Sequence, residues 1–366
     1  MNEFGVIPQE DSSNPTYYSR KIISTWIYFE EAHEGGVYSQ VTGVSHTRRF
    51  HDVYRRCLIT FFYSARSANP EAHLLLFTNK DIRLENGHIN RKLLTVLEEL
   101  KVEIVTLNYT YTPPLQQKLW RNQFFVLDIL SYLAQNVDDN DLCLILDSDI
   151  VWSGNNRSPE FWEKLDRQNI LTMTPIENRN EIINGLTIDE LRSVASQVIM
   201  RELPNFQYIG GEFIALKGFL IRNLQTRIRE NWNAYNVALG SMKMEYWEEA
   251  HFLSITFANL AETYGNGNDF IKRIWTSSFG YSNKKYHDHS LVLWHLPAEK
   301  RFGIHRLANS ILRDGQFTWP IYGSEKWVQM AMSLGILGTS KPKYLLDISK
   351  YLIDEIVKAF EKRFTK

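Results

Sequence analysis

Short apolar runs alternate with longer amphipathic segments over about the first 150 residues. Four runs are rich in β-branched, leucine or aromatic residues and are short enough to be buried strands: residues 22–29, 72–80, 102–109 and 141–152. The intervening segments are predicted to be helices: residues 47–64, 91–100 and 119–134. This alternation predicts an α/β fold with a mostly parallel sheet flanked by helices, in which ligands bind at the carboxyl ends of the strands.

The pattern is less regular in the rest of the chain. We expect three further helices and one short strand: helices at 188–201, 219–235 and 246–264, and a strand within 206–216. Residues 341–366 have apolar residues at helical spacing, namely Leu345, Ile348, Leu352, Ile356 and Phe360. That spacing predicts an amphipathic C-terminal helical extension.

Composition narrows the range of partners. The chain of 366 residues has 41 Lys and Arg against 42 Asp and Glu, a net charge of −1. No overall field therefore favours nucleic acid, and we expect any anionic ligand to be held locally. Apolar residues make up 44% of the chain, which is enough for a core and argues against disorder.

Cysteine usage and the absence of long apolar segments bear on location. Cys57 and Cys143 each lie beside an apolar run, which predicts buried free thiols in a reducing cytoplasm. The first twenty residues lack the apolar stretch of a secretion signal, and no segment reaches the roughly 20 apolar residues that span a bilayer. We therefore expect a cytoplasmic protein, or one peripheral to the inner face of the membrane.

The most informative motif is Asp147-Ser148-Asp149, directly after the apolar run 142–146. Two carboxylates at the end of a buried strand are costly unless a cation lies between them. Mg²⁺ and Mn²⁺ prefer carboxylate oxygens and usually keep sites for water or phosphate oxygens. The motif therefore predicts a metal that bridges the protein and a diphosphate, although a loop with two solvated aspartates is the simpler alternative.

This motif resembles the DXD motif of metal-dependent glycosyltransferases with the GT-A fold. The order of YIGGEFIAL and EYWEEAHFLS after it is similar to the retaining family 6, the blood-group α-galactosyl and N-acetylgalactosaminyl transferases. Matched residue by residue, Glu248 would hold the donor sugar, Glu249 would face the anomeric carbon and His251 would support them. Glu248 departs from the aspartate of the family pattern. Glu212, after two glycines, is an alternative catalytic carboxylate.

Two further segments extend the resemblance. In LWRNQFFVLDIL, Arg121 matches a basic residue that contacts the donor. In WHLPAEKRFGIHR, similar to the C-terminal segment of the retaining family 8, His295 would complete the metal shell with Asp147 and Asp149, and Lys300 would contact the diphosphate. A core histidine is the alternative interpretation of His295.

The resemblance implies a GT-A-like (Rossmann-like) fold and a hexosyltransferase of polysaccharide biosynthesis. It implies a nucleotide-sugar donor, UDP-linked, a glycan or glycolipid acceptor, and Mn²⁺ or Mg²⁺, with retention favoured over inversion. The expected division has a polar leader at 1–20 and a nucleotide-sugar-binding half at 21–155. An acceptor-binding and catalytic half follows at 156–325, and a C-terminal helical extension at 326–366.

Several alternatives stay open at this point. Two alternatives to a glycosyltransferase are a non-catalytic module that binds sugar nucleotides or glycans, and a phosphatase of the HAD-like class in which Asp147 is the nucleophile. Glu248 and Glu249 also suit the first turn of any helix, where acids favour the dipole. His287, Asp288 and His289 are a second candidate metal cluster. The C-terminal segment, with a net charge of +3, suits packing on the main domain or peripheral contact with a membrane.

Overall fold

A computed structural model describes residues 19–36, 38, 40–41, 43–113, 120–176, 178, 180–241, 248–260, 263–314 and 317–364. The main sheet has seven strands in the order β3-β2-β1-β4-β7-β6-β8. Their bounds are β1 Lys21–Ile27, β2 His73–Thr78, β3 Val102–Thr106, β4 Leu142–Leu146, β6 Ile170–Thr172, β7 Phe213–Lys217 and β8 Gly265–Asn266. Strand β7 alone runs antiparallel to its neighbours β4 and β6, so the predicted mostly parallel sheet is confirmed.

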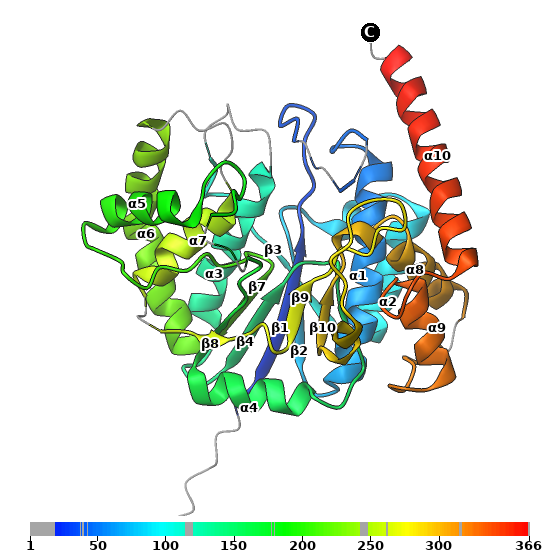
Figure 1. Ribbon diagram of the computed structural model, residues 1–366, viewed down its shortest axis with the longest axis horizontal. Helices are drawn as coiled ribbons and strands as arrows, with labels where there is room; N and C mark the ends of the chain where they lie inside the picture. Colours follow the sequence, from blue (N-terminus) through cyan, green and yellow to red (C-terminus); the bar gives the residue numbers. More distant parts are fainter. Residues whose placement is uncertain are drawn as a thin grey trace, which may run out of the picture.

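Helices cover both faces of this sheet, as Figure 1 shows. On one side lie α1 Arg48–Ala68, α2 His88–Glu99, α8 Gly303–Arg313, α9 Glu325–Ser333 and α10 Lys341–Phe364. On the other lie α3 Phe125–Asn136, α5 Ile188–Ile199, α6 Gly218–Ser241 and α7 Glu249–Ala258, and α4 Ser158–Gln168 crosses below the sheet in this view. The α/β fold class and the C-terminal helical extension are both confirmed.

Successive side chains of the central strands contribute in turn to two hydrophobic cores, one on each face of the sheet. Ile23 of β1 and Leu144 of β4 belong to the core shared with α1, α2 and α8. Their sequence neighbours Ile22 and Cys143 belong to the core shared with α3, α5, α6 and α7. Because successive strand residues point to opposite faces, an unbroken apolar run serves both cores. Cys57 and Cys143 are both buried free thiols, as predicted.

A second, three-stranded sheet lies beside the end of β4. It consists of β5 Ile150–Trp152, β10 Leu293–His295 and β9 Ile271–Arg273 in the order β5-β10-β9. Strand β5 begins directly after the Asp147-Ser148-Asp149 turn, and β10 pairs with it antiparallel, with His295 opposite Ile150. The predicted single strand at 141–152 is therefore two strands in two sheets.

Several elements differ from the expected boundaries, and a few were not expected at all. Strands β6, β8, β9 and β10 were not predicted, because two- and three-residue strands carry no measurable periodicity. Helices α4, α8 and α9 were not predicted either, although α8 buries Ile304, Leu307 and Ile311 at helical spacing. The signal for α4 was present, since Ser158-Pro159 begins it and Phe161, Trp162 and Leu165 are buried. Of the expected segments, residues 1–18, 119, 246–247, 261–262 and 365–366 lie outside the described residues.

Helix α10 packs on the protein through its charged side. Lys343 forms ion pairs with Glu299, at 3.1 Å, and with Asp347, while Arg306 contacts Asp347 at 2.7 Å. The predicted amphipathic helix is confirmed, but Leu345, which its periodicity placed on the packing side, is 62% exposed. Among the described residues, no helix is long and apolar enough to cross a membrane.

This buried network yields a stability prediction. Lys343→Ala removes a cation that is 3% exposed and leaves the carboxylates of Glu299 and Asp347 without it. Loss of one partner of a buried ion pair costs about 3–5 kcal/mol. We expect the free energy of unfolding in urea to fall by that order, whereas Lys341→Ala, at an exposed position of the same helix, should change it by less than about 0.5 kcal/mol. Equal unfolding midpoints for the two variants would contradict the assignment.

Candidate active site

The Asp147-Ser148-Asp149 motif forms the turn between β4 and β5, at the carboxyl end of a central strand. The N–H of Asp147 donates to the carbonyl of Glu212 at 3.2 Å, and the N–H of Ile150 donates to the carbonyl of Asp147 at 3.1 Å. The first bond holds the turn against the residue before β7, and the second closes the turn. The two carboxylates are therefore held at the edge where an α/β sheet binds its ligands.

Asp147, Asp149 and His295 lie together as a group of side chains that could hold a metal ion, and their role as metal ligands stays a prediction. One ligand atom each from Asp147, Asp149 and His295 lies within 4.8 Å of the others. Nε2 of His295 is 3.3 Å from Oδ2 of Asp149 and 3.9 Å from Oδ2 of Asp147. Two carboxylates and one imidazole suit Mn²⁺ or Mg²⁺ with positions left for ligand oxygens. Within the described residues, no other group of three or more His, Cys, Asp and Glu side chains has this geometry.

The opposite nitrogen of His295 is held by a second carboxylate. Nδ1 of His295 lies 3.2 Å from Oε1 of Glu212, and the same oxygen accepts a 2.6 Å hydrogen bond from Nε of Arg273. A carboxylate on the far nitrogen of a ligating histidine fixes the ring and leaves Nε2 directed at the metal. Glu212, one of the predicted catalytic carboxylates, is therefore placed to orient His295.

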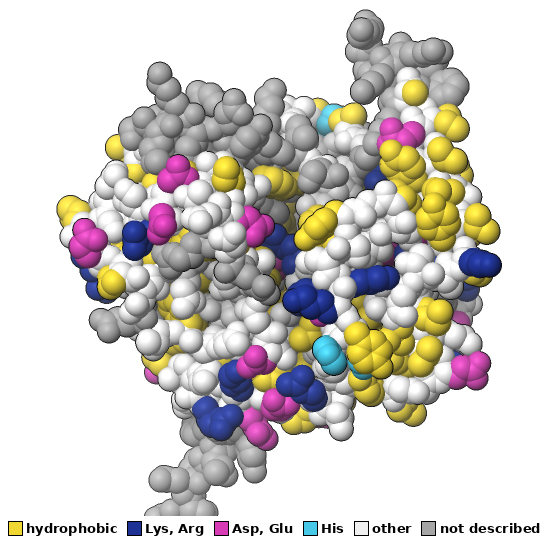
Figure 2. Space-filling view, viewed as in Figure 1, with side chains coloured by type: hydrophobic (Ala, Val, Ile, Leu, Met, Phe, Trp, Pro, Cys, Tyr) yellow, Lys and Arg dark blue, Asp and Glu magenta, His cyan; other side chains and the backbone are white. Residues whose placement is uncertain are grey.

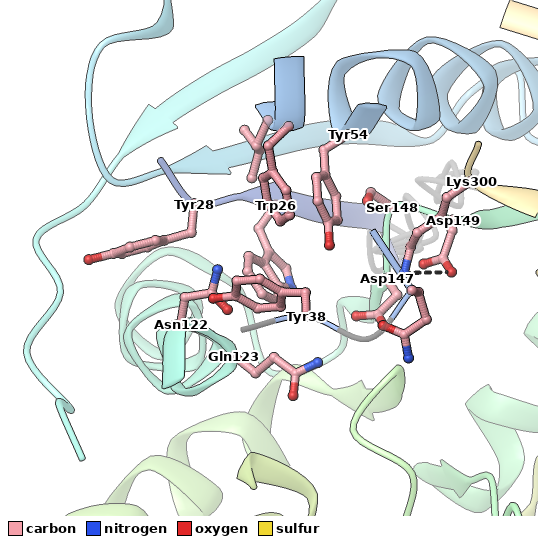
Figure 3. A pocket seen from close by; sticks show the side chains of 13 residues that line it. Trp26, Tyr28, Tyr38, Tyr54, Asn122, Gln123, Asp147, Ser148, Asp149 and Lys300 are labelled. Atoms are coloured by element: carbon pink, nitrogen blue, oxygen red, sulfur yellow. Dashed lines mark ion pairs between the residues drawn. The ribbon is translucent and has the colours of Figure 1, made fainter. Parts of the chain in front are cut away.

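Lys300 lies on the other side of Asp149. Its Nζ is 3.0 Å from Oδ2 of Asp149 and lies over the ring of Tyr54, 5.6 Å from the centroid. The ion pair is the dashed line in Figure 3. That Oδ2 is buried and accepts no hydrogen bond of good geometry from the described residues, so it retains the capacity to ligate a cation.

The two aspartates differ in charge state because their surroundings differ. Burial, followed by repulsion from Asp149, raises the pKa of Asp147 to about 6. Burial alone would raise the pKa of Asp149 as well, but Lys300 and His295 outweigh it and hold that pKa well below its usual range. Burial would lower the pKa of His295, but Asp149 and Glu212 outweigh it and raise that pKa to about 9. Asp149 is thus the firmly ionised member of the pair.

Glu248 and Glu249 begin α7, the helix whose residues are all buried. Glu248 accepts hydrogen bonds from the hydroxyl of Tyr208 and the amide of Asn184. Oε2 of Glu249 is buried with no hydrogen-bond partner in the described part of the chain. Burial, then repulsion from Glu248 and Asp147, raises the pKa of Glu249 well above its ordinary value. This environment favours the protonated form of Glu249, which lies close enough to Asp147 for the two carboxyl groups to interact.

The paired glycines before Glu212 leave room for these carboxylates. A Cβ at Gly211 would lie 2.5 Å from Oε1 of Glu249, and one at Gly210 would lie 2.5 Å from Oε2 of Glu212. Any larger residue would therefore displace an acid of the site. The small size of these two glycines therefore serves the packing of the carboxylates of the site.

His251, the predicted supporting residue, is buried behind Glu248. Its Nε2 lies 3.2 Å from the carbonyl of Ile183 and 3.6 Å from Oε1 of Glu248. Burial lowers the pKa of His251 and favours its neutral form, in which Nε2–H donates to the carbonyl of Ile183 and the ring packs beside Glu248.

Negative charge exceeds positive charge in this site. The acids are Asp147, Asp149, Glu212, Glu248 and Glu249, and the facing cations are Lys300, Arg273 and His295. The raised pKa of Glu249 reduces this excess of negative charge, and a divalent cation at Asp147, Asp149 and His295 would reduce it further. The donor set and its charge therefore fit a metal.

Aromatic side chains line the cleft beside the motif. They are Trp26, Tyr28, Tyr38, Phe50 and Tyr54. The polar Asn122 and Gln123 line the same cleft and lie near Tyr38 in Figure 3. Flat rings with polar tips suit the stacking of a base or a sugar. Arg121 directly precedes Asn122, and its carbonyl accepts a hydrogen bond from the hydroxyl of Tyr109, but no described contact joins it to the aspartates. Its predicted role in donor binding stays a prediction.

The second candidate metal cluster is occupied by other contacts. Asp288 is paired with Lys272 at 2.8 Å, and Nδ1 of His289 contacts the carbonyl of Tyr286.

Three residues of the site, Arg273, Tyr54 and Tyr208, were not predicted from the sequence. Nothing in the sequence around Arg273 marks it, because it contacts Glu212 from 61 residues away through a three-residue strand.

The chain was compared with known proteins. No protein-family model and no curated protein matches it. Among solved structures it is similar to the galactosyltransferase LgtC in complex with donor and acceptor sugar analogs, at 11% identity, 88% coverage of this chain, 98% of that chain and a TM-score of 0.41. It is similar to an active-site mutant of LgtC at 11% identity with the same coverages and a TM-score of 0.43. It is similar to the bifunctional glycosyltransferase WbbM at 10% identity, 77% coverage of this chain, 46% of that chain and a TM-score of 0.40. Likenesses this low assign no activity.

Metal binding can be tested without any substrate. We expect the protein to bind one Mn²⁺ in isothermal titration, and Asp149→Asn to weaken that binding by about 100-fold or more, since it removes a charged ligand. Asp166→Asn, at an exposed aspartate that pairs with Lys217, is the matched control and should bind as the wild type does. Unchanged Mn²⁺ affinity in Asp149→Asn would show that the metal lies elsewhere.

Proposed function

We propose that this protein is a metal-dependent glycosyltransferase of the GT-A-like type. It moves a sugar from a nucleoside-diphosphate donor, for which we propose a UDP-sugar, to a hydroxyl of a glycan or glycolipid acceptor. The observation that carries the proposal is the metal triad with Lys300 on one side and the buried acid Glu249 on the other. Positive charge at the departing diphosphate assists glycosyl transfer, and a carboxylate near the anomeric carbon can stabilise the positive charge that develops there. The cleft offers both.

Asp147, Asp149 and His295 are the residues that would hold Mn²⁺ or Mg²⁺. Such an ion acts as a Lewis acid on diphosphate oxygens. Lys300 adds a fixed positive charge at the same end, since its ammonium already lies 3.0 Å from Asp149. Glu212 keeps His295 oriented, and Arg273 keeps Glu212 ionised: burial would raise the pKa of Glu212, but Arg273 and His295 outweigh it and hold that pKa below its usual range.

Glu249 is the proposed catalytic carboxyl group. Its unpartnered Oε2 is available to a substrate atom, and its protonation depends on the neighbouring carboxylates. Positive charge that develops on the sugar would favour its ionised form, with the proton passing to the departing diphosphate, so that the Glu249 carboxylate stabilises the anomeric carbon or attacks it as the bond to the diphosphate breaks. We favour retention of configuration on this basis. Glu248, fixed by Tyr208 and Asn184, is proposed to bind a hydroxyl of the donor sugar.

The rest of the cleft suits the nucleoside. Trp26, Tyr38 and Tyr54 offer rings for stacking next to the motif. Residues 21–155 supply these rings and the two aspartates, which supports the proposed nucleotide-sugar-binding half. Glu248, Glu249 and His295 come from the proposed catalytic half, 156–325.

A panel of nucleotide sugars with Mn²⁺ tests the activity directly. We expect release of UDP from at least one donor that depends on Mn²⁺, together with a rise in the melting temperature. Donor binding without release over hours would identify a binding module instead. Phosphate release from phosphomonoesters that requires Asp147 would identify the phosphatase.

Substitution of Glu249 separates catalysis from binding. Glu249→Gln keeps the size of the side chain, so donor affinity should stay within about tenfold while turnover falls by about 100-fold or more, the scale of one positioned catalytic group. Glu98→Gln, at an exposed position of α2, is the control. Wild-type turnover in Glu249→Gln would show that Glu249 is not a catalytic residue, whereas the proposed metal site would still stand.

A further inference from the structure

Helix α10 turns its charged residues toward the protein and its large apolar residues toward solvent. Lys343, Asp347 and Asp354 are 3%, 2% and 3% exposed, whereas Ile356 is 58% exposed. A helix that packs on a globular domain ordinarily does the reverse, because burial of apolar surface is what stabilises it there. The arrangement indicates that the apolar side has a partner of its own.

The exposed apolar residues of α10 lie on the side of the helix opposite its buried charges, and one of them, Tyr351, also packs against the ring of Phe279, with 4.9 Å between the ring centroids. Seven of the sixteen large hydrophobic side chains exposed in the described part of the chain lie on this helix: Tyr344, Leu345, Leu346, Tyr351, Leu352, Ile353 and Ile356. We name this set the apolar stripe. Figure 2 shows hydrophobic side chains gathered along α10, which projects from the body in Figure 1. Contiguous exposed apolar surface of this kind marks an interaction site.

We propose that the apolar stripe docks α10 on the surface of an anionic phospholipid bilayer. The helix would lie in the plane of the membrane, with the stripe at the boundary between headgroups and acyl chains and its ion-paired side toward the protein. Its 24 residues span about 36 Å, enough for several lipid headgroups. The proposal does not depend on the activity of the cleft.

Positive charge beside the helix favours an anionic surface. A pocket between α1 and α10 is lined by five basic residues and two acids: Arg48, Arg49, Arg56, Arg301, Lys350, Asp52 and Asp354. Asp354 is buried and paired with Arg49 at 3.1 Å and Arg301 at 3.0 Å, so it presents no open negative charge, while the side chain of Arg49 stays 54% exposed. A helix is about 10 Å across, so these cations lie within about one Debye length of headgroups that contact the stripe.

A second copy of the chain is a poorer partner for the stripe. In a two-fold dimer the same surface meets itself, so each α10 would bring its own basic pocket toward the other. The stripe would be buried, but the basic clusters around Arg49 and Lys350 would meet no opposite charge in such a dimer. A layer of anionic headgroups has the complementary charge.

Vesicle co-sedimentation of the full chain tests the docking. We expect binding to vesicles that contain phosphatidylglycerol to be at least about tenfold stronger than to pure phosphatidylcholine, and to weaken as salt is raised. Leu352→Asp combined with Ile356→Asp should reduce the binding by about tenfold or more, because it places two charges in the stripe. Both replaced side chains are largely exposed, so the fold should be retained, which circular dichroism checks.

The matched control combines Leu84→Asp with Ile321→Asp. These two apolar side chains are each 80% exposed and lie outside α10, so this variant should bind vesicles as the wild type does. Failure of the wild type to bind anionic vesicles, or equal binding by the stripe variant, would overturn the proposal. A wild-type dimer in sedimentation analysis that the stripe variant does not form would also overturn it, in favour of a second copy.

Discussion

The candidate site depends on an excess of buried carboxylates at the carboxyl end of β4. Asp147, Asp149 and Glu212 meet there with Glu249, and the cations that face them do not balance their charge. An uncompensated buried carboxylate is destabilising. Lys300 and His295 lower the pKa of Asp149 and favour its ionised form, whereas burial and the neighbouring acids raise the pKa of Glu249 and favour its protonated form. The position between Asp147, Asp149 and His295 is where a divalent cation would complete the balance.

The topology of the chain brings these groups together. The turn after β4 supplies only Asp147 and Asp149, so the other side chains of the site must come from distant parts of the chain. The small sheet β5-β10-β9 does this, since β10 pairs with β5 directly after the motif and delivers His295 beside Asp149, while β9 delivers Arg273 to Glu212. Lys300 follows β10 by a few residues, and Glu299 next to it anchors α10 through Lys343. One short strand pair thus links the candidate site to the C-terminal helix.

Much of the framework was predictable, for identifiable reasons. The long apolar run of β4 and the periodicity of α3 predict their elements, and the position of Asp147 after a buried strand predicts its place at the ligand-binding edge. His295 was found only through a resemblance, because a three-residue strand has no periodicity. Arg273 was missed for the same reason. The sequence of α10 predicts an amphipathic helix, but which side packs depends on Glu299 and Arg306, which are remote in sequence.

The most direct measurement is anomalous X-ray scattering at the manganese absorption edge from crystals of the protein with Mn²⁺ and UDP. The account predicts one strong peak within bonding distance of Asp147, Asp149 and His295, with diphosphate oxygens on its open side and Lys300 beside them. A peak bound by other residues, or no peak while UDP is bound elsewhere, would contradict it.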